Sequence, residues 1–343
     1  PNTEAVQVFG HEGDDTFDVF SDPNIPIFID GGDPIGSTAG DTLIVHGPAI
    51  FEQGPENDEG RFVNPGNESI SFDHIEAAIV DGGPPFPAKA FISGDGADND
   101  ITIIARDESF NLAADGVRDF TSTVDSGLEV LWLNFDQLVI DAKSGDDDIV
   151  FRVPAPNNAD WDVDAWVFGG APAAGPGDEG DRLVVSTPST DGPDNILYTP
   201  TAVDSGTLVI DEDGNNVFDG TDTIIQIGNV PVMPPMPDFP DPDPFGVELL
   251  VYDGESGDDT IVVFGDGDGS VNDSFEHAPG EARDQGFVGA VANDDTRLGI
   301  NYVNLGVVGF VTIDGLTGNN SLVALGSNDS DSMDVDFNAT DAI

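Results

Sequence analysis

Short runs of apolar residues alternate with turn-forming residues along the whole sequence. Each run is rich in Val, Ile, Leu or Phe and is bounded by Gly, Asp, Asn or Pro, which is the pattern of a β-strand. No long stretch combines a 3.6-residue apolar period with helix-capping signals, so we expect helix to be nearly absent. The predicted strands are Phe17–Phe20, Ile27–Ile29, Leu43–Val45, Ile101–Ile104, Leu128–Leu133, Leu138–Ile140, Ile149–Phe151, Leu183–Val185, Leu208–Ile210, Ile224–Ile227, Leu249–Tyr252, Ile261–Phe264, Val311–Ile313 and Leu322–Leu325.

The strands recur in a unit of strand, Asp-containing turn, Gly-Asp-Asp turn and strand. A second unit has a longer Gly/Pro loop between its two strands. The clear copies of the first unit are 135–153, 245–264 and 308–325, its partial copies are 8–19 and 72–104, and the second unit occupies 27–45 and 167–185. Such internal repeats are typical of proteins in which each unit stacks on the next.

The repeats predict an all-β, elongated architecture of the parallel β-helix or β-solenoid type. Tandem β-sandwich modules are the alternative, because degenerate strand repeats also suit them. The strands 249–252 and 261–264 are apolar throughout, which indicates burial on both faces and favours the stack.

The repeats divide the chain into blocks at 1–125, 126–227 and 247–343, with a Pro-rich segment at 228–246. Proline lacks the amide that a central strand must donate, so this segment is not a central strand. We expect either a loop that leaves the stack or an ordered arm that docks on a neighbouring subunit. The arm would use its apolar side chains, Met233, Met236 and Phe239.

The charge of the chain excludes several functions. Of 343 residues, 67 are acidic and 9 basic, which gives a formal net charge of -58. A surface that binds nucleic acid or anionic lipid needs clustered basic residues, which this chain does not have. The 38% of hydrophobic residues is enough for a folded core. The absence of Cys excludes disulfides and thiolate chemistry.

Three of the turns carry a recognisable motif. At Gly10–Phe17, Gly254–Ile261 and Gly315–Leu322 the unit resembles the nonapeptide G-G-x-G-x-D-x-U-x of RTX proteins. The whole arrangement is similar to long repetitive surface and secreted proteins of marine and planctomycete-type bacteria. This resemblance implies a parallel β-helix or β-roll-like stack, an extracellular or cell-surface location, and Ca²⁺ bound in the turns.

The resemblance also places the family's Ca²⁺-binding Asp at single positions of this sequence, and shows where the sequence departs from the motif. The metal-binding Asp falls on Asp15, Asp147 and Asp259. The second Gly of the motif is replaced by other residues, and in the last copy the Asp is replaced by Asn. These replacements are His11, Glu255, Leu316 and Asn320.

The chemistry of the turns also favours calcium. Ca²⁺ takes about six to eight hard oxygen ligands, and a Gly-Asp-Asp turn offers both carboxylates and backbone carbonyls. The candidate metal ligands are Asp14, Asp15, Asp98, Asp100, Asp146, Asp147, Asp258 and Asp259. Further acidic clusters are Asp178/Glu179/Asp181, Asp211/Glu212/Asp213, Asp266/Asp268 and Asp329/Asp331.

The acidic turns also have explanations without a metal. Asp and Gly form good turns, and the charge can serve as a solvated surface or as an adaptation to high salt. The excess of Asp over Glu, concentrated in turns, favours calcium.

Catalysis has little support in the sequence. A β-helix lyase needs a basic group near the sugar carboxylate, and only Lys89, Lys143 and a few Arg are present. A glycosidase needs two positioned carboxylates, and no pair stands out among so many. We therefore expect no enzymatic activity and assign no catalytic residue.

The sequence thus predicts an extracellular structural protein, a subunit or segment of a surface filament, sheath or layer that Ca²⁺ stabilises. Open stacks have unpaired strand edges, so we expect head-to-tail self-association, and a surface polysaccharide is a possible further partner. A Ca²⁺-dependent adhesin or stalk region is the second interpretation, and a β-helix enzyme acting on polysaccharide is the third.

Overall fold

The computed structural model describes residues 4–33, 40–83, 88–106, 118–153, 161–172, 180–188, 194–211, 222–228, 242, 245–265, 272–316 and 320–325. Every regular element in these residues is a β-strand, which confirms the all-β class and the near absence of helix. Among them, no helix has the length and apolar character needed to cross a bilayer.

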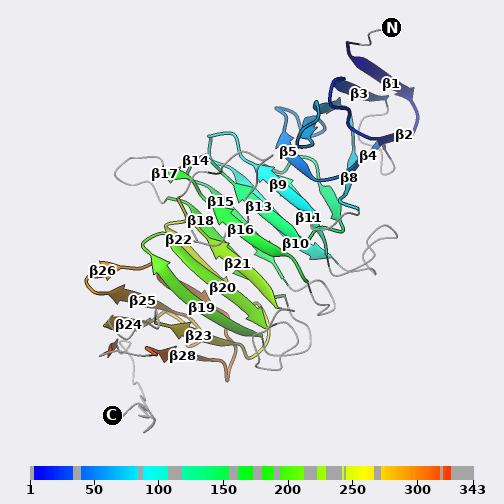
Figure 1. Cartoon of the computed structure of the whole chain (residues 1–343). Helices are drawn as coiled ribbons and strands as arrows, with labels where there is room; N and C mark the ends of the chain where they lie inside the picture. Colours follow the sequence, from blue (N-terminus) through cyan, green and yellow to red (C-terminus); the bar gives the residue numbers. More distant parts are fainter. Residues whose placement is uncertain are drawn as a thin grey trace.

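Two large sheets, which we call sheet A and sheet B, contain almost all the strands (Figure 1). Sheet A has 13 strands in the described residues. Their order across the sheet is β1 (Val6–Glu12), β3 (Ile27–Asp33), β7 (Ile70–Asp73), β6 (Gly60–Val63), β5 (Ala49–Gln53), β9 (Lys89–Ser93), β13 (Gln137–Asp141), β16 (Asp164–Phe168), β21 (Thr223–Ile227), β20 (Ser205–Asp211), β19 (Asn195–Ala202), β23 (Thr260–Phe264) and β28 (Phe310–Asp314).

Sheet B has 14 strands in the same part of the chain. Their order is β2 (Thr16–Val19), β4 (Thr42–His46), β8 (Ala77–Asp81), β12 (Val130–Leu133), β11 (Asp119–Val124), β10 (Asp100–Arg106), β15 (Asp148–Arg152), β18 (Arg182–Ser186), β22 (Leu249–Asp253), β27 (Ile300–Val303), β25 (Gly286–Ala292), β24 (Asp273–Pro279) and β29 (Ser321–Ala324), with β26 (Asp295–Thr296) beside β25. A small separate sheet pairs β14 (Ser144–Gly145) with β17 (Ala171–Pro172).

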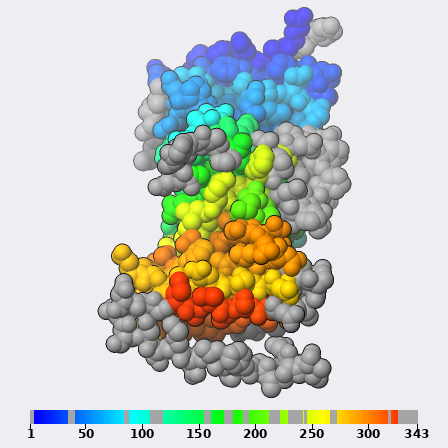
Figure 2. All heavy atoms as spheres, turned by 90° about the vertical axis from the view of Figure 1, so that its left-hand side faces the viewer, coloured from blue at the N-terminus to red at the C-terminus, as the bar shows by residue number. Residues whose placement is uncertain are grey.

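The chain alternates between the two sheets, and one pass through both is called a coil here. Each new strand lies parallel to a strand of an earlier pass; β13, for example, pairs in parallel with β9 on one side and β16 on the other. Figures 1 and 2 show the sequence colours following one direction, from blue at one end to red at the other. The repeated units of the sequence are therefore half-coils, each a strand of one sheet, a corner turn and a strand of the other.

The sheets also contain antiparallel segments that a regular stack of parallel strands lacks. In each sheet the described chain twice makes a three-stranded antiparallel meander in place of a single strand. The meanders are β5–β6–β7 and β19–β20–β21 in sheet A, and β10–β11–β12 and β24–β25–β27 in sheet B. Each meander reverses direction twice, so the parallel stacking resumes on both sides of it.

One hydrophobic core lies between the sheets. Its buried members run without a break from Ile29 to Leu305, so the described coils share a single core. Near the middle, Trp132 packs edge-on against Phe135 and donates its indole N–H to Ser122 Oγ at 2.8 Å.

The two strands for which the sequence predicts burial on both faces, 249–252 and 261–264, alternate in burial instead. On β22, Leu250 and Tyr252 point into the core and are fully buried, whereas Leu249 and Val251 on the outer face are only half-buried. Burial on both faces of this strand is therefore partial.

Candidate functional site

The second Asp of the Gly-Asp-Asp turn bonds one coil to the next. Asp147 Oδ1 accepts the backbone N–H of Asn99 at 2.7 Å, and the backbone N–H of Asp147 donates to Asp181 Oδ1 at 3.0 Å. The N–H of Asp181 in turn donates to Glu248 Oε2 at 2.7 Å. We call each of these corner residues a rung and the series an aspartate ladder. The rungs directly precede β10, β15, β18 and β22, which are neighbours in sheet B, so the ladder runs along one edge of that sheet.

A second aspartate ladder joins the N-terminal coils on the same edge. The N–H of Asp15 donates to Asp41 Oδ1 at 2.6 Å, and the N–H of Asp41 donates to Glu76 Oε2. These residues precede β2, β4 and β8, again neighbours in sheet B. Both ladders end in a Glu, at the coil where a meander interrupts the parallel run of sheet B.

Two shorter ladders follow the same pattern. The N–H of Asp273 donates to Asn320 Oδ1 at 2.9 Å before β24 and β29. The N–H of Asp194 donates to Asp259 Oδ1 at 3.0 Å before β19 and β23 of sheet A, so this ladder lies on the opposite edge of the stack. The three Asp positions that the resemblance assigns to the metal therefore do not form one row: Asp15 and Asp147 lie on one edge and Asp259 on the other.

At several corners a glycine at the start makes room for the rung. A Cβ on Gly254 would lie closer than 3.0 Å to Asp259 Oδ2 and to the carbonyl oxygen of Asn304 in the next coil. A Cβ on Gly169 would meet Asp181 Oδ2 and the Gly246 carbonyl oxygen in the same way. At these corners the Gly-and-Asp spacing of the repeat lets a carboxyl group pack against backbone.

Several rung carboxyls are buried with one oxygen that accepts no hydrogen bond from the described residues. Asp147, Asp181 and Asp259 are at most 1% exposed, and their Oδ2 atoms have no hydrogen-bond donor in the described part of the chain. Asp41 Oδ2 and Asp194 Oδ2 are in the same situation. A buried charged oxygen without a donor or a cation is strongly unfavourable, so these atoms require a proton or a cation.

The pKa values of these rungs are raised accordingly. Burial, and then the charge of neighbouring carboxylates, raises the pKa of Asp147 and of Asp259 to about 7. The same causes raise the pKa of Asp181 and of Asp194 to about 6. The carboxyls of Asp147 and Asp181 are also close enough for a hydrogen bond between them, which needs a shared proton and lowers the pKa of Asp181 in part.

The rungs fit a hard cation in the kind of atoms they offer. Asp147 Oδ2 and Asp181 Oδ2 belong to successive coils, and the Gly246 carbonyl oxygen and Asp181 Oδ2 both lie next to Gly169. Within the described residues, however, no three acidic or histidine side chains gather into a group that holds a metal. A Ca²⁺ here would take further ligands from carbonyls or water, both of which it accepts.

The structure separates the two acids of each predicted metal pair. The first Asp lies outside the ladder: Asp98 Oδ1 accepts the N–H of Asp146 at 3.0 Å, and Asp258 Oδ1 accepts the N–H of Val308 at 2.9 Å. Asp14, Asp98 and Asp258 are exposed, and Asp146 is half-buried.

Asp100 is also exposed, and its N–H donates to Asp125 Oδ1 at 2.8 Å.

Sequence reasoning missed part of the ladders. Asp41 and Asp194 were not singled out as candidates, and neither were the terminal rungs Glu76 and Glu248. Asp181 was noted only within an acidic cluster. The available signal was a Gly-Asp or Pro-Asp pair directly before an apolar strand, as at Gly40-Asp41 and Pro193-Asp194.

The positions where the sequence departs from the motif keep the backbone conformation that the motif glycine favours. His11, Glu255 and Leu316 have φ values of 74°, 48° and 54°, and Lys143 at the equivalent place has 78°. Non-glycine residues rarely adopt this left-handed region. The corner geometry is therefore retained although the glycine is not.

Some predicted features lie outside the described residues. They are Asp178, Glu179, Glu212, Asp213, Asp266, Asp268, Asp329, Asp331 and the Pro-rich apolar residues Met233, Met236 and Phe239.

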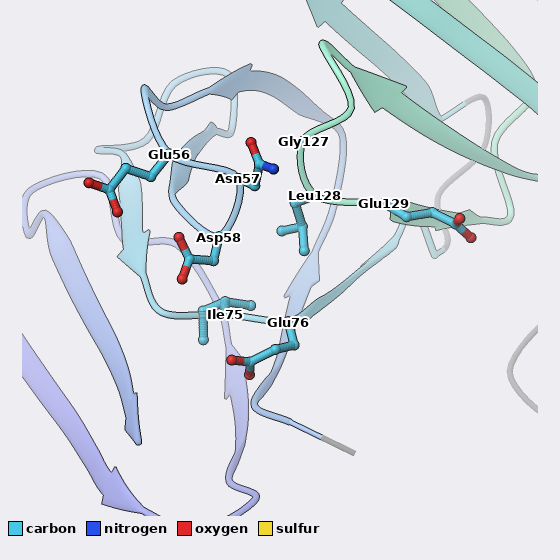
Figure 3. Close-up of a pocket in the computed structure, with 8 residues that line it drawn as sticks. All are labelled: Glu56, Asn57, Asp58, Ile75, Glu76, Gly127, Leu128 and Glu129. Carbon is cyan, nitrogen blue, oxygen red and sulfur yellow. The ribbon is translucent and has the colours of Figure 1, made fainter. Parts of the chain in front are cut away.

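An acidic pocket of about 460 Å³ opens beside the N-terminal ladder (Figure 3). Four carboxylates line it, and two of them already have partners: Glu76 accepts the Asp41 N–H, and Glu129 pairs with Arg106 at 3.6 Å. Its lining residues are Glu56, Asn57, Asp58, Ile75, Glu76, Gly127, Leu128 and Glu129. We assign no catalytic pair to this pocket.

No protein-family model matches the sequence, and comparisons with curated proteins and with solved structures also find no match. The resemblance to RTX repeats therefore stays a prediction from the motif residues.

Proposed function

We propose that this chain is an extracellular structural protein, a subunit or segment of a surface filament, sheath or layer, in which Ca²⁺ ties successive coils together. The observation that carries the proposal is the aspartate ladder. In an enzyme, such carboxyls would take part in the reaction. Here they accept backbone hydrogen bonds that join one coil to the next. Such bonding fits a protein whose task is to be long and rigid.

Calcium enters the proposal through the uncompensated rungs. The Oδ2 atoms of Asp147 and Asp181 are buried and lack a donor in the described residues, and the whole chain carries a formal charge of -58. A divalent ion between rungs neutralises two carboxylates at once and attracts the further charge of neighbouring residues such as Asp146. The same argument applies to the pairs Asp15/Asp41 and Asp194/Asp259.

The extracellular location rests on the resemblance to secreted repeat proteins. A Ca²⁺-dependent adhesin or stalk region is the second interpretation, and the same ladder supports it, because a stalk also needs rigid coils. The two interpretations differ in whether further coils come from other copies or from the same polypeptide. A polysaccharide-cleaving enzyme has no observation in its favour in the described residues.

Thermal unfolding tests the calcium part of the proposal. We would compare EGTA, millimolar Ca²⁺, millimolar Mg²⁺ and matched ionic strength of NaCl, for the wild type and for Asp181→Asn. Asn already stands at the equivalent rungs Asn99 and Asn320, so the variant should fold. Ligands of the native state raise Tm by mass action, and we expect a rise specific to Ca²⁺ that is smaller in Asp181→Asn.

Equal stabilisation by NaCl and Ca²⁺ would show that the acids are only screened, and calcium would be withdrawn from the proposal. If the Ca²⁺-dependent rise in Tm is unchanged in Asp181→Asn, the ion does not bind at this ladder.

A further inference from the structure

We propose that a second copy of this chain stacks on the end of the first, with β28 of one copy beside β1 of the next and β29 beside β2. Both sheets then run through the junction. This inference rests on the proposed structural function and names its partner. It follows from three properties of the end coils, which are strand direction, exposed apolar side chains and the polarity of the ladders.

The end strands of each sheet run in the same direction. In sheet A every neighbouring pair is parallel except the two antiparallel pairs on either side of β6 and the two on either side of β20. An even number of reversals leaves β1 and β28 parallel. Sheet B has the same arrangement around β11 and β25, so β2 and β29 are also parallel. A shift along the stack, without any reversal, brings matching edges together.

Exposed apolar residues gather at these two ends. Among the described residues, all the exposed large hydrophobic side chains except Val203 and Phe245 lie in or beside the end strands. At one end they are Val8, Phe9 and Phe20, and at the other Val307, Val308, Phe310, Leu316, Leu322, Val323 and Leu325. Phe310 is 58% and Val308 67% exposed. Covering them with another coil is favourable by the hydrophobic effect.

The inward and outward faces also match. On β28, Val311 and Ile313 pack on the core while Phe310 and Thr312 face outward. On β1, Val6 pairs with Ile27, a residue that packs on the core, so Gln7 lies on the outward face. A parallel pairing that keeps core residues inside places Gln7 and Thr312 of different copies on the same outer face.

The ladders have a direction that continues across the junction. In each described ladder the donor N–H belongs to the earlier coil and the accepting side chain to the later one. Asp15 is the first rung of its ladder and Asn320 the last of another, and both lie before strands of sheet B. Stacking therefore puts Asn320 of one copy in the donor position toward Asp15 of the next.

The contact uses two different surfaces of the same chain. Such a head-to-tail contact that advances along an axis gives an open filament and not a closed dimer. The charge of -58 opposes the approach of two copies, so assembly should require cations.

Cysteine trapping tests the junction, because the chain has no Cys of its own. We would prepare Gln7→Cys and Thr312→Cys and treat them with a short bismaleimide in Ca²⁺, whose span tolerates a shift in register. The two variants mixed should give covalent dimers that contain one of each. A Gln7→Cys, Thr312→Cys double variant should give a series of larger oligomers, and each single variant alone should stay largely monomeric.

Val203→Cys is the matched control, since Val203 is 64% exposed but lies between β19 and β20, away from the end strands. Mixed with Gln7→Cys it should give few dimers. Equal trapping in this control, or no trapping of the Gln7/Thr312 mixture at any Ca²⁺ concentration, would overturn the inference. A Ca²⁺-specific rise in Tm without trapping would leave the structural function and remove the second copy as partner.

Discussion

The backbone N–H of Asp147 donates a hydrogen bond to Oδ1 of Asp181, at 3.0 Å and across 34 residues of sequence. The bond joins the corner of one coil to the corner of the next. It leaves Asp181 Oδ2 buried against the turn, where it has no donor in the described residues. The same carboxyl therefore accepts a backbone hydrogen bond through one oxygen and requires a proton or a cation at the other.

The stability of the calcium-free protein should fall as pH rises. The rung pKa values are raised to about 7 for Asp147 and Asp259 and about 6 for Asp181 and Asp194, against 3.8 for the unperturbed group. A raised folded pKa means that the native state holds these protons more tightly than the unfolded chain. Their stabilising contribution is present at about pH 4 and is lost through pH 6 to 7, at up to about 1.4 kcal/mol per pH unit for each group.

Thermal unfolding in EGTA between pH 4.5 and 8 measures this, and we expect Tm to decrease over that range. Saturating Ca²⁺ should flatten the profile, because the ion and the proton compete for the same oxygens. A Tm that increases with pH in EGTA would contradict the raised pKa values.

An extra carboxylate in the ladder should lower the free energy of unfolding. Asn99 is 2% exposed, and its Nδ2 donates to Asp125 Oδ2 at 3.0 Å. Asn99→Asp removes that donor and adds a charge beside Asp147, so we expect a loss of about 1–3 kcal/mol in the free energy of unfolding at pH 8 and a smaller loss at pH 5. Urea unfolding at both pH values checks this. Asn24→Asp, an exposed position, adds the same charge and should change stability little.

The corner glycines should not tolerate a methyl group. Gly254→Ala places a Cβ closer than 3.0 Å to Asp259 Oδ2 and to a backbone carbonyl, neither of which can move freely. We expect a destabilisation of about 1–3 kcal/mol, measured by urea unfolding. In Gly289→Ala the new Cβ meets only the Phe287 ring closely, which can rotate. If both variants lose the same stability, tight packing at the corner is not the cause.

Restoring a motif glycine should stabilise the corner. Leu316 has φ 54° and is 41% exposed, so its side chain is strained in the left-handed region and gains little from burial. Leu316→Gly removes a penalty of about 1–2 kcal/mol and adds a backbone entropy cost of about 0.5–1 kcal/mol. We expect a net gain of up to about 1 kcal/mol in thermal unfolding. Leu322→Gly, in an extended strand, should give no gain, and a loss in Leu316→Gly would contradict the strain.

The strands with continuous apolar runs were predictable from the sequence, and all of them are present. Leu138–Ile140 and Ile261–Phe264 lie within β13 and β23, because short β-branched runs between Gly and Asp have few alternatives to a strand. Of the meander strands, β10, β12, β20 and β21 were predicted and others were missed. β19, β24 and β25 contain Pro, His, Glu or Gly within the strand, and antiparallel pairing with a neighbouring hairpin strand compensates for the weaker pattern.

The candidate site was predictable in composition but not in geometry. The Gly-Asp-Asp turns correctly drew attention to Asp147 and Asp259, which are rungs. Their partners Asp181 and Asp194 lie 34 and 65 residues away in the sequence, and the intervening loops and meanders have irregular lengths. Register between coils is set by strand pairing, which a single sequence does not reveal.

An experimental structure in millimolar Ca²⁺ at neutral pH, with anomalous scattering to identify ions, tests the central claim most directly. We expect an ion between Asp147 Oδ2 and Asp181 Oδ2, with carbonyl or water oxygens completing its shell, and the ladder hydrogen bonds in place. A structure in which these two carboxyls share a proton without an ion would contradict calcium as the tie between coils. Loss of the Asp147-to-Asp181 hydrogen bond would contradict the ladder itself.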